Sequence, residues 1–327
     1  GLVLYRLAPS ADSYRASDIS ETAVDMLNDT IFKNQNLQHV KVDVQAADNP
    51  LLYQSHYDMV ILNSVIQYFP NHAYLEKVLR LIGDTIAENG QAFIGDIRSE
   101  PLLKAFHTSV ELSRMPGDTS ESLLKAAVDR GIFMDYELCV NPAFFMNLRA
   151  VHPRMTGVEI LYKQSRYDNE MRRYRYDVVI YFDHIPDSWP CDKELVWGQQ
   201  SPAELEKMVS SQMYNSIRLS HVPNTDVLPE LYQYQQLLYD SDENRIVCDI
   251  HAAAARMRQQ EAWSKEQWRK MAEHYGYHME CLWSGPDMDS YYDLVFIRSC
   301  EIPNLSHYIC RQSKREIVSD FSDYFNL

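Results

Sequence analysis

Short runs rich in β-branched residues alternate with helix-length amphipathic segments through about the first 100 residues. This alternation is typical of repeated strand–helix units, in which each helix crosses over to place the next strand parallel to the last. It predicts an α/β fold with a doubly wound, mostly parallel sheet. The predicted strands cover residues 12–19, 39–44, 57–63 and 91–96.

Two amphipathic segments supply the crossovers between these strands. Residues 21–32 carry apolar side chains at helical spacing, and Ser20 is a good N-cap before them. Residues 73–87 repeat the pattern ahead of the fourth strand. Further on, residues 157–163 and 174–182 are β-rich and flank a charged connection, which predicts an antiparallel pair that closes the sheet.

Polar residues close all four predicted strands: Asp18, Asp43, Asn63 and Asp96. Each one alone could be a turn residue or a helix cap, since Asp and Asn favour such positions. In open α/β sheets, however, ligands bind at the carboxyl ends of the strands, beside the switch in strand order. Taken together, the four residues indicate a binding site at that edge.

The length of 327 residues exceeds that of a usual single domain, so a core with an appended subdomain is expected. A boundary is predicted at Pro186 to Pro190, where two prolines enclose a polar turn. We therefore expect a core over 1–185 and a C-terminal subdomain over 186–327. The subdomain is predicted to hold helices at 228–239 and 264–275 and strands at 277–283 and 294–298.

Composition excludes several classes of protein. Hydrophobic residues make up 46% of the chain, enough for a packed interior, and the formal charge of -15 would repel nucleic acid. The six cysteines lie far apart without metal-ligand spacing, so we expect reduced thiols, no metal and a cytoplasmic protein. No apolar run reaches membrane-spanning length, so no membrane partner is expected.

Two long runs of sequence resemble a known family. The run YDMVILNSVIQYFPNHAYLEKVL and the later ENGQAFIGDIRSEPLLKAFHTSVEL are similar to the methyltransferase domains embedded in nonribosomal peptide synthetases and polyketide synthase hybrids. The resemblance continues almost to the end of the chain, in the segments SHVPN, EHYGYHMECLWSG and SDYFNL. It implies a class I methyltransferase-like fold, S-adenosylmethionine as cofactor, and an acceptor held as a thioester on the phosphopantetheine arm of an acyl or peptidyl carrier protein, beside neighbouring synthetase domains.

The chain departs from the family pattern at its start. Family members carry a glycine-rich loop after their first strand, and Gly1 resembles the last glycine of that loop. The first strand and the rest of the loop are therefore expected to be missing from this chain. Because the loop backbone must approach the cofactor without interference from Cβ atoms, we expect poor cofactor binding in their absence.

The strand ends gain cofactor roles from this resemblance. Asp18 is placed to accept hydrogen bonds from ribose hydroxyls, although a helix cap is the alternative. Asp43 is expected to accept from the adenine amino group, with Val44 against the ring, although a plain strand-end role is the alternative. The expected cofactor-binding residues are Gly1, Asp18, Ile19, Asp43, Val44, Asn63 and Ser64.

The acceptor side is expected around Gln67, Tyr68, Asp96 and Arg98. His107 and Glu111 stand four residues apart on a predicted helix, so Glu111 could orient the imidazole. From spacing alone the pair could be a solvated helix face. The family pattern also carries this histidine, which makes His107 the expected general base.

A basic cluster stands out against the acidic chain. Its members are Arg166, Arg172, Arg173 and Arg175. It could dock a phosphate of the carrier arm or an acidic carrier protein. The alternative is a charged hairpin connection exposed to water.

Three functions compete at this point. N-methylation of a carrier-bound aminoacyl or peptidyl thioester is the first, and O-methylation of a carrier-bound hydroxyacyl chain is the second. A non-catalytic scaffold domain is the third, because of the missing glycine loop. The segment after Pro190 is expected to cover the cleft as a lid or to dock the carrier.

Overall fold

The computed structural model describes residues 2–163, 169–184, 191–199, 201–239, 245–260, 263–285 and 290–299. The strands are β1 (Tyr14–Asp18), β2 (Val40–Val44), β3 (Tyr57–Asn63), β4 (Ile86–Ser99), β5 (Cys139–Val140), β6 (Met155–Tyr162), β7 (Arg175–Phe182), β8 (Lys193–Val196), β9 (Ser216–Pro223), β10 (Tyr277–Trp283) and β11 (Tyr291–Arg298). The α-helices are α1 (Leu2–Leu7), α2 (Glu21–Phe32), α3 (His72–Thr85), α4 (Leu103–Arg114), α5 (Glu121–Phe133), α6 (Pro142–Met146), α7 (Leu148–Val151), α8 (Glu170–Tyr174), α9 (Pro202–Ser210), α10 (Leu228–Tyr239), α11 (Val247–Gln260) and α12 (Lys265–His274).

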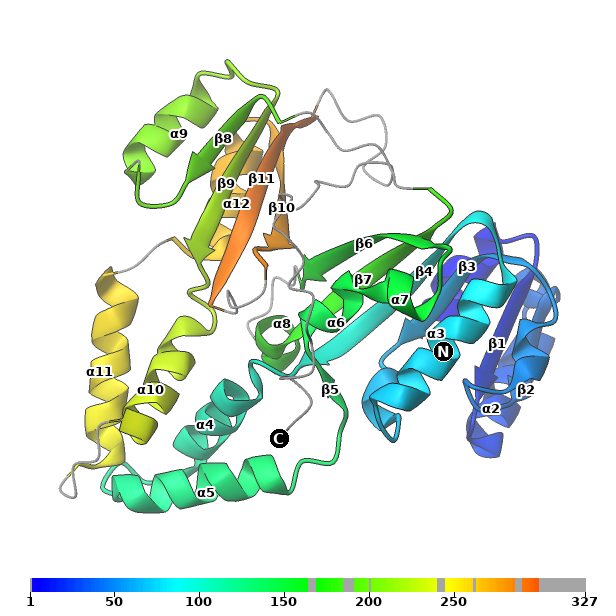
Figure 1. Cartoon of the computed structure of the whole chain (residues 1–327), viewed down its shortest axis with the longest axis horizontal. Coiled ribbons are helices and arrows are strands. Elements are labelled where there is room, and N and C mark those ends of the chain that lie inside the picture. Colours follow the sequence, from blue (N-terminus) through cyan, green and yellow to red (C-terminus); the bar gives the residue numbers. More distant parts are fainter. Residues whose placement is uncertain are drawn as a thin grey trace.

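The strands form two sheets, and the α/β class is confirmed. β1 and β2 pair in parallel, and the larger sheet has nine strands in the order β3-β4-β7-β6-β10-β11-β9-β8, with β5 beside β4 (Figure 1). The strand pairs formed within residues 2–140 are parallel, as the strand–helix alternation predicted. The predicted antiparallel hairpin is also confirmed, because β6 pairs with β7 and β7 lies against β4.

The larger sheet continues past the predicted domain boundary. β10 joins β6 through the antiparallel pair Leu282 and Leu161, and β11 and β9 follow it, also antiparallel. β8 then closes the edge parallel to β9. The segment Pro186 to Pro190, where we predicted the boundary, lies outside the described residues.

The main core lies between the larger sheet and the helices packed on it, among them α3 and α12. In α3 the side chains of Leu75, Val78, Leu79 and Ile82 repeat at helical spacing, and all four are fully buried. Asn71 begins this helix, because its side chain accepts a hydrogen bond from the backbone N–H of Tyr74 at 2.9 Å. This packing fixes the ends of β3 and β4, which carry several of the predicted site residues.

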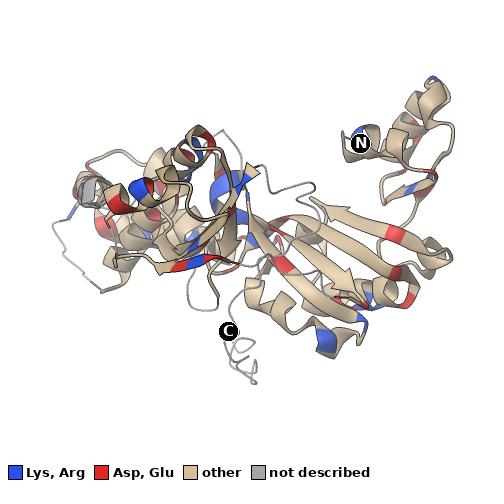
Figure 2. Ribbon diagram, turned by 90° about the horizontal axis from the view of Figure 1, so that it is seen from above, with Lys and Arg blue, Asp and Glu red and all other residues tan. Residues whose placement is uncertain are grey.

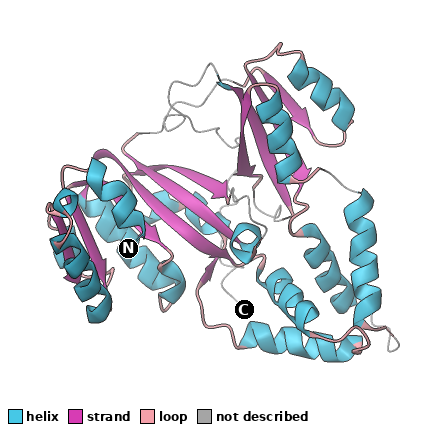
Figure 3. Cartoon of the chain, turned by 180° about the vertical axis from the view of Figure 1, so that it is seen from behind, coloured by secondary structure: helices cyan, strands magenta, loops and turns pink. Residues whose placement is uncertain are grey.

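A second group of helices packs away from the sheet. α4 and α5 contact α10 and α11 through a smaller apolar cluster that includes Leu112, Leu124, Leu237 and Ile250 (Figure 3). Helices from the first part of the chain and from its C-terminal part therefore share one interior. This group holds α4, the helix that carries His107.

Charged residues of both signs are spread over the helices and strands (Figure 2). Many of them form ion pairs, and Arg154 with Asp183 at 2.7 Å is one example. In the part of the chain that the structure describes, we find no helix with the length and apolarity needed to cross a membrane.

The predicted element bounds were mostly accurate, and β4 is the exception. It was predicted over 91–96 but runs from Ile86 to Ser99, so Asp96 lies within the strand and not at its end. The predicted helix over 21–32 is confirmed, and the Ser20 hydroxyl accepts from Ala23 N as expected of an N-cap. The helix predicted over 73–87 instead ends at Thr85, and β4 begins at Ile86. Ile86 pairs with Tyr57 of β3, so a tertiary contact takes these residues from the helix into the sheet.

Candidate active site

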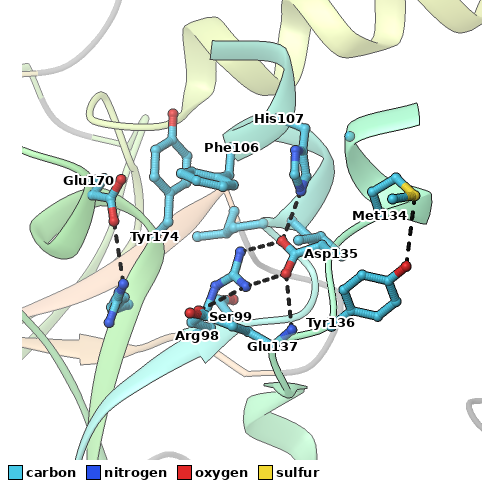
Figure 4. A pocket seen from close by; sticks show the side chains of 14 residues that line it. Arg98, Ser99, Phe106, His107, Met134, Asp135, Tyr136, Glu137, Glu170 and Tyr174 are labelled. Carbon is cyan, nitrogen blue, oxygen red and sulfur yellow. Dashed lines mark hydrogen bonds and ion pairs between the residues drawn. The ribbon is translucent and has the colours of Figure 1, made fainter. Parts of the chain in front are cut away.

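A cavity of about 380 Å³ opens at the carboxyl end of β4. Its walls come from β4, α4, the end of α5, the loop after α5, and α8 (Figure 4). One side is charged and carries Arg98, His107 and Asp135, and Phe106 and Tyr174 belong to the apolar side. The lining residues are Arg98, Ser99, Leu102, Leu103, Phe106, His107, Gly131, Met134, Asp135, Tyr136, Glu137, Glu170, Tyr174 and Arg175.

Asp135 contacts both of the other residues named on the charged side. Arg98 donates two hydrogen bonds to it, from Nη1 at 2.7 Å and from Nη2 at 2.6 Å. The His107 Nε2 lies 2.9 Å from Asp135 Oδ2. Burial alone would raise the pKa of Asp135, but the hydrogen bonds from Arg98 and His107 hold it at about 2. The carboxylate is therefore ionised at neutral pH.

This pairing sets the tautomer of His107. An ionised carboxylate can only accept hydrogen bonds, so the ring nitrogen that faces it, Nε2, must carry a proton. In the neutral ring the lone pair then lies on Nδ1. Nδ1 faces Gly131 on α5, where a Cβ atom would lie only 2.7 Å away. The missing side chain at Gly131 therefore makes room for the nitrogen that can accept a proton.

Glu111 does not have the orienting role that we expected from its spacing. Its carboxylate accepts a hydrogen bond from Arg114 Nη1 at 3.4 Å, within the same helix. Asp135 contacts the imidazole instead. Sequence reasoning missed Asp135 because it lies 28 residues from His107 and meets it only through the packing of α5 against α4. The sequence carries no local pattern that connects the two residues.

The ends of β3 and β4 form a second polar cluster beside the cavity. Asn63 Nδ2 donates to Ser64 Oγ at 3.1 Å, and Ser64 Oγ donates to Asp96 Oδ2 at 2.9 Å. Asp96 is 3% exposed and also accepts from Arg175 Nη1 at 2.8 Å. Arg175 lines the cavity, so it links the strand ends to the acceptor side. The structure thus brings together two of the four predicted strand-end residues, Asn63 and Asp96, through Ser64.

Backbone strain marks the same place. Ser64 has φ +56° and Asp96 has φ +65°, a left-handed conformation that residues other than glycine rarely adopt. Such conformations cluster at ligand sites, where surrounding contacts hold them in place. The hydrogen bond from Ser64 N to Gly95 O at 3.0 Å is one of these contacts.

The other two strand ends, on β1 and β2, are more open. Asp18 Oδ1 accepts from Ser20 N at 2.9 Å, and Asp43 Oδ2 accepts from Arg15 Nε at 2.7 Å. These bonds are the ones expected of a turn residue and of a plain strand-end residue. Among the described residues, the second oxygen of each carboxylate accepts no hydrogen bond, which leaves it for a ligand. The apolar neighbours Ile19 and Val44 are 76% and 45% exposed. Exposed aliphatic groups beside carboxylates fit a ring and hydroxyls, so these residues fit S-adenosylmethionine, and their roles stay predictions.

The predicted acceptor residues differ in their surroundings. Gln67 is buried and donates from Nε2 to Ser64 O at 3.1 Å, while its Oε1 finds no partner among the described residues. Tyr68 is 71% exposed, beside the buried Phe69. Arg98 lines the cavity and is paired with Asp135. Gly1 lies outside the described residues.

The basic cluster is not a free docking patch. Arg172 pairs with Asp226 at 2.7 Å, Arg173 with Glu230 at 3.3 Å and Arg175 with Asp96 at 2.8 Å. Arg172 is only 9% exposed, so the alternative of a solvated hairpin does not hold for it either. Arg166 lies outside the described residues.

No protein-family model matches the chain. Among curated proteins, it is 39% identical over 201 residues to the probable non-canonical nonribosomal peptide synthetase CymA of Salinispora arenicola, covering 61% of this chain and 2% of that protein. It is 31% identical over 238 residues to chondramide synthase cmdD of Chondromyces crocatus, covering 71% of this chain and 6% of that protein. Among solved structures, an S-adenosylmethionine-dependent methyltransferase from Clostridium acetobutylicum is 12% identical with a TM-score of 0.39, covering 56% of this chain and 80% of that one.

The chain is thus homologous to a short segment of nonribosomal peptide synthetases, which confirms the resemblance stated from the sequence. The chain spans only 2% and 6% of the two curated relatives.

Proposed function

We propose that the chain transfers the methyl group of S-adenosylmethionine to the amine of an aminoacyl or peptidyl thioester on a carrier protein. The observation that carries the proposal is the cavity that holds the His107–Asp135 pair and whose lining residue Arg175 donates a hydrogen bond to Asp96 of the strand-end cluster. We further propose that it works inside a longer synthetase, like the proteins that it resembles.

The cofactor supplies an electrophilic methyl group on a sulfonium. The residues that would hold it are Asp18, Asp43 and the ends of β3 and β4, which fit it as described above. The protein must also place the acceptor atom in line with that methyl group and exclude water. The apolar walls formed by Leu103, Phe106 and Tyr174 support this second task.

The proton of the acceptor goes to His107 in this proposal. Nδ1 carries the lone pair, and Asp135 stabilises the positive charge that the ring gains when it accepts a proton. Arg98 keeps Asp135 ionised and holds it in place through two hydrogen bonds. His107 is then the base, and Asp135 and Arg98 are positioning residues.

The charge balance of the cavity favours an amine as the acceptor. Three carboxylates, Asp135, Glu137 and Glu170, line it, against the two guanidinium groups of Arg98 and Arg175. An α-amine arrives partly as its ammonium ion, which a carboxylate excess attracts. The amine must then lose one proton before it can attack, and in this proposal His107 takes it.

O-methylation of a hydroxyacyl thioester is the second candidate. The buried His107–Asp135 pair favours it, because a hydroxyl group must lose its proton as the new bond forms and so needs a positioned base.

We propose that the segment after Pro190 covers the cleft as a lid or docks the carrier, and that the protein is cytoplasmic.

The two candidates can be separated with matched acceptors. The full-length synthetase is given carrier proteins loaded with an amino acid or with the corresponding hydroxy acid, and mass spectrometry follows addition of a methyl group to each thioester. We expect the aminoacyl thioester to be methylated faster. Faster methylation of the hydroxyacyl thioester would favour the second candidate, and methylation of neither would contradict the proposal.

A further inference from the structure

A buried ionic cluster lies behind the cavity, outside the residues discussed so far for chemistry. Asp226 follows β9 and is 9% exposed. It accepts from Arg172 Nη2 at 2.7 Å and Nε at 3.3 Å, and Lys265 Nζ lies 3.3 Å from it. Burial alone would raise the pKa of Asp226, but Lys265 and Arg172 hold it below its usual value. The cluster is therefore ionic inside the protein.

The cluster connects three distant parts of the chain. Arg172 lies on α8, between β6 and β7; Asp226 follows β9; and Lys265 begins α12. Lys265 Nζ also lies 4.8 Å from the centre of the Tyr162 ring, at the end of β6. Asp226 thus ties the C-terminal part of the chain to the hairpin that closes the core sheet.

This connection lies directly behind the acceptor cavity. α8 has five residues, and Arg172 stands between Glu170 and Tyr174, both of which line the cavity. Arg175, the first residue of β7, also lines it. A shift of α8 would therefore move three cavity-lining side chains together, those of Glu170, Tyr174 and Arg175.

An apolar cluster reinforces the same contact. Val227, next to Asp226, is fully buried in a cluster with Leu102, Ala105 and Tyr174, against which Phe106 packs. The Phe106 and Tyr174 rings meet edge to face, with centroids 5.4 Å apart. The apolar wall of the cavity is thus backed by the residue that follows Asp226.

We propose that Asp226 is a positioning residue of the methyl-transfer site, which holds α8 so that Tyr174 and Arg175 keep their places at the acceptor cavity. This inference rests on the proposed function for its catalytic consequence. It gives the C-terminal part of the chain a direct role in shaping the acceptor site, in addition to any role as a lid.

The chain offers a matched control in a second buried ion pair. Asp293 on β11 accepts from Arg218 Nη2 at 2.6 Å and is 2% exposed, and neither residue lines the cavity. Asp226→Asn and Asp293→Asn each remove one buried charge at nearly constant volume. Both variants should lower thermal stability, because each replaces the carboxylate beside a buried guanidinium by a neutral amide.

The test compares these variants in the full-length synthetase. For Asp226→Asn we expect kcat/KM for the loaded carrier to fall at least about tenfold, since small displacements of positioning groups have effects of this size, with the Kd for S-adenosylmethionine nearly unchanged. For Asp293→Asn we expect both quantities to stay within about twofold, and Asp226→Glu should recover part of the loss. Equal losses of kcat/KM in the two Asn variants, or no loss in Asp226→Asn, would overturn the proposal.

Hydrogen–deuterium exchange of the peptide that contains residues 169–177 provides a readout that does not depend on the acceptor. We expect faster exchange there in Asp226→Asn and parent-like exchange in Asp293→Asn. If the parent enzyme methylates neither acceptor but this exchange pattern appears, the proposed function fails while the positioning of α8 by Asp226 stands. Parent-like exchange in Asp226→Asn would overturn the positioning role itself.

Discussion

Replacing Gly131 by alanine tests the arrangement around His107. A Cβ atom at this position would lie 2.7 Å from Nδ1, 3.3 Å from Cγ and 3.4 Å from Cε1 of the imidazole. Overpacking of this kind costs about 1–3 kcal/mol, whereas Gly to Ala inside a helix gains about 1 kcal/mol. We therefore expect Gly131→Ala to lower the free energy of unfolding by up to about 2 kcal/mol, and to lower turnover because the ring must move.

The sign should reverse once the ring is removed. In a His107→Ala background the space is free, so Gly131→Ala should stabilise α5 by up to about 1 kcal/mol through helix propensity alone. Urea unfolding is measured for the parent, both single variants and the double variant through hydrogen exchange of the α5 amides. The four free energies of unfolding give the coupling energy between positions 107 and 131. The same effect of Gly131→Ala in both backgrounds would refute the view that the ring occupies this space.

Three further predictions concern carboxylates. Asp135→Asn should lower turnover by about 10² to 10⁴ at unchanged cofactor affinity, measured by single-turnover methyl transfer, because the tautomer of His107 is no longer fixed. Asp18→Ala should weaken S-adenosylmethionine binding by about 1.5–3 kcal/mol in calorimetric titration, and an unchanged Kd would remove Asp18 from the site. Burial raises the pKa of Glu159 to about 7. In the unfolded chain this carboxyl ionises at about pH 4.3, so the free energy of unfolding should fall as the pH rises from there to about 7. In urea unfolding at pH 8, Glu159→Gln should be more stable than the parent. An equal gain in stability at pH 4 would contradict this.

The local sequence pattern was enough to predict most strands of the core and the helices α2 and α3, but not the short elements β5, α6 and α7. The residues from Tyr57 to Asn63 form a strand as predicted, because a β-rich run there ends at a polar turn. The same reasoning placed Asn63 and Asp96 on neighbouring strands, and Ser64 connects them by hydrogen bonds, although β4 runs on past Asp96 to Ser99. Parallel strands bring their carboxyl ends to one edge, so this part of the site follows from secondary structure alone.

The partners of the charged residues could not be predicted in this way. His107 was predicted to pair with Glu111 from helical spacing, but Asp135 reaches it from the end of another helix. Arg172 was grouped with its sequence neighbours as a surface patch, but it is buried against Asp226. Both outcomes depend on how helices pack over long sequence separations, and spacing along the chain carries no information about that.

The role of His107 as the base is tested most directly by methyl transfer in two histidine variants of the full-length synthetase. His152 is a matched control, because its ring also pairs with a carboxylate, Asp84 at 3.2 Å, but lies outside the cavity lining. On the carrier-bound aminoacyl thioester, His107→Ala should lower turnover by about 10² to 10⁴ with cofactor affinity nearly intact, while His152→Ala stays close to the parent. A loss of less than about threefold in His107→Ala, or an equal loss in His152→Ala, would contradict the assignment of His107 as the base.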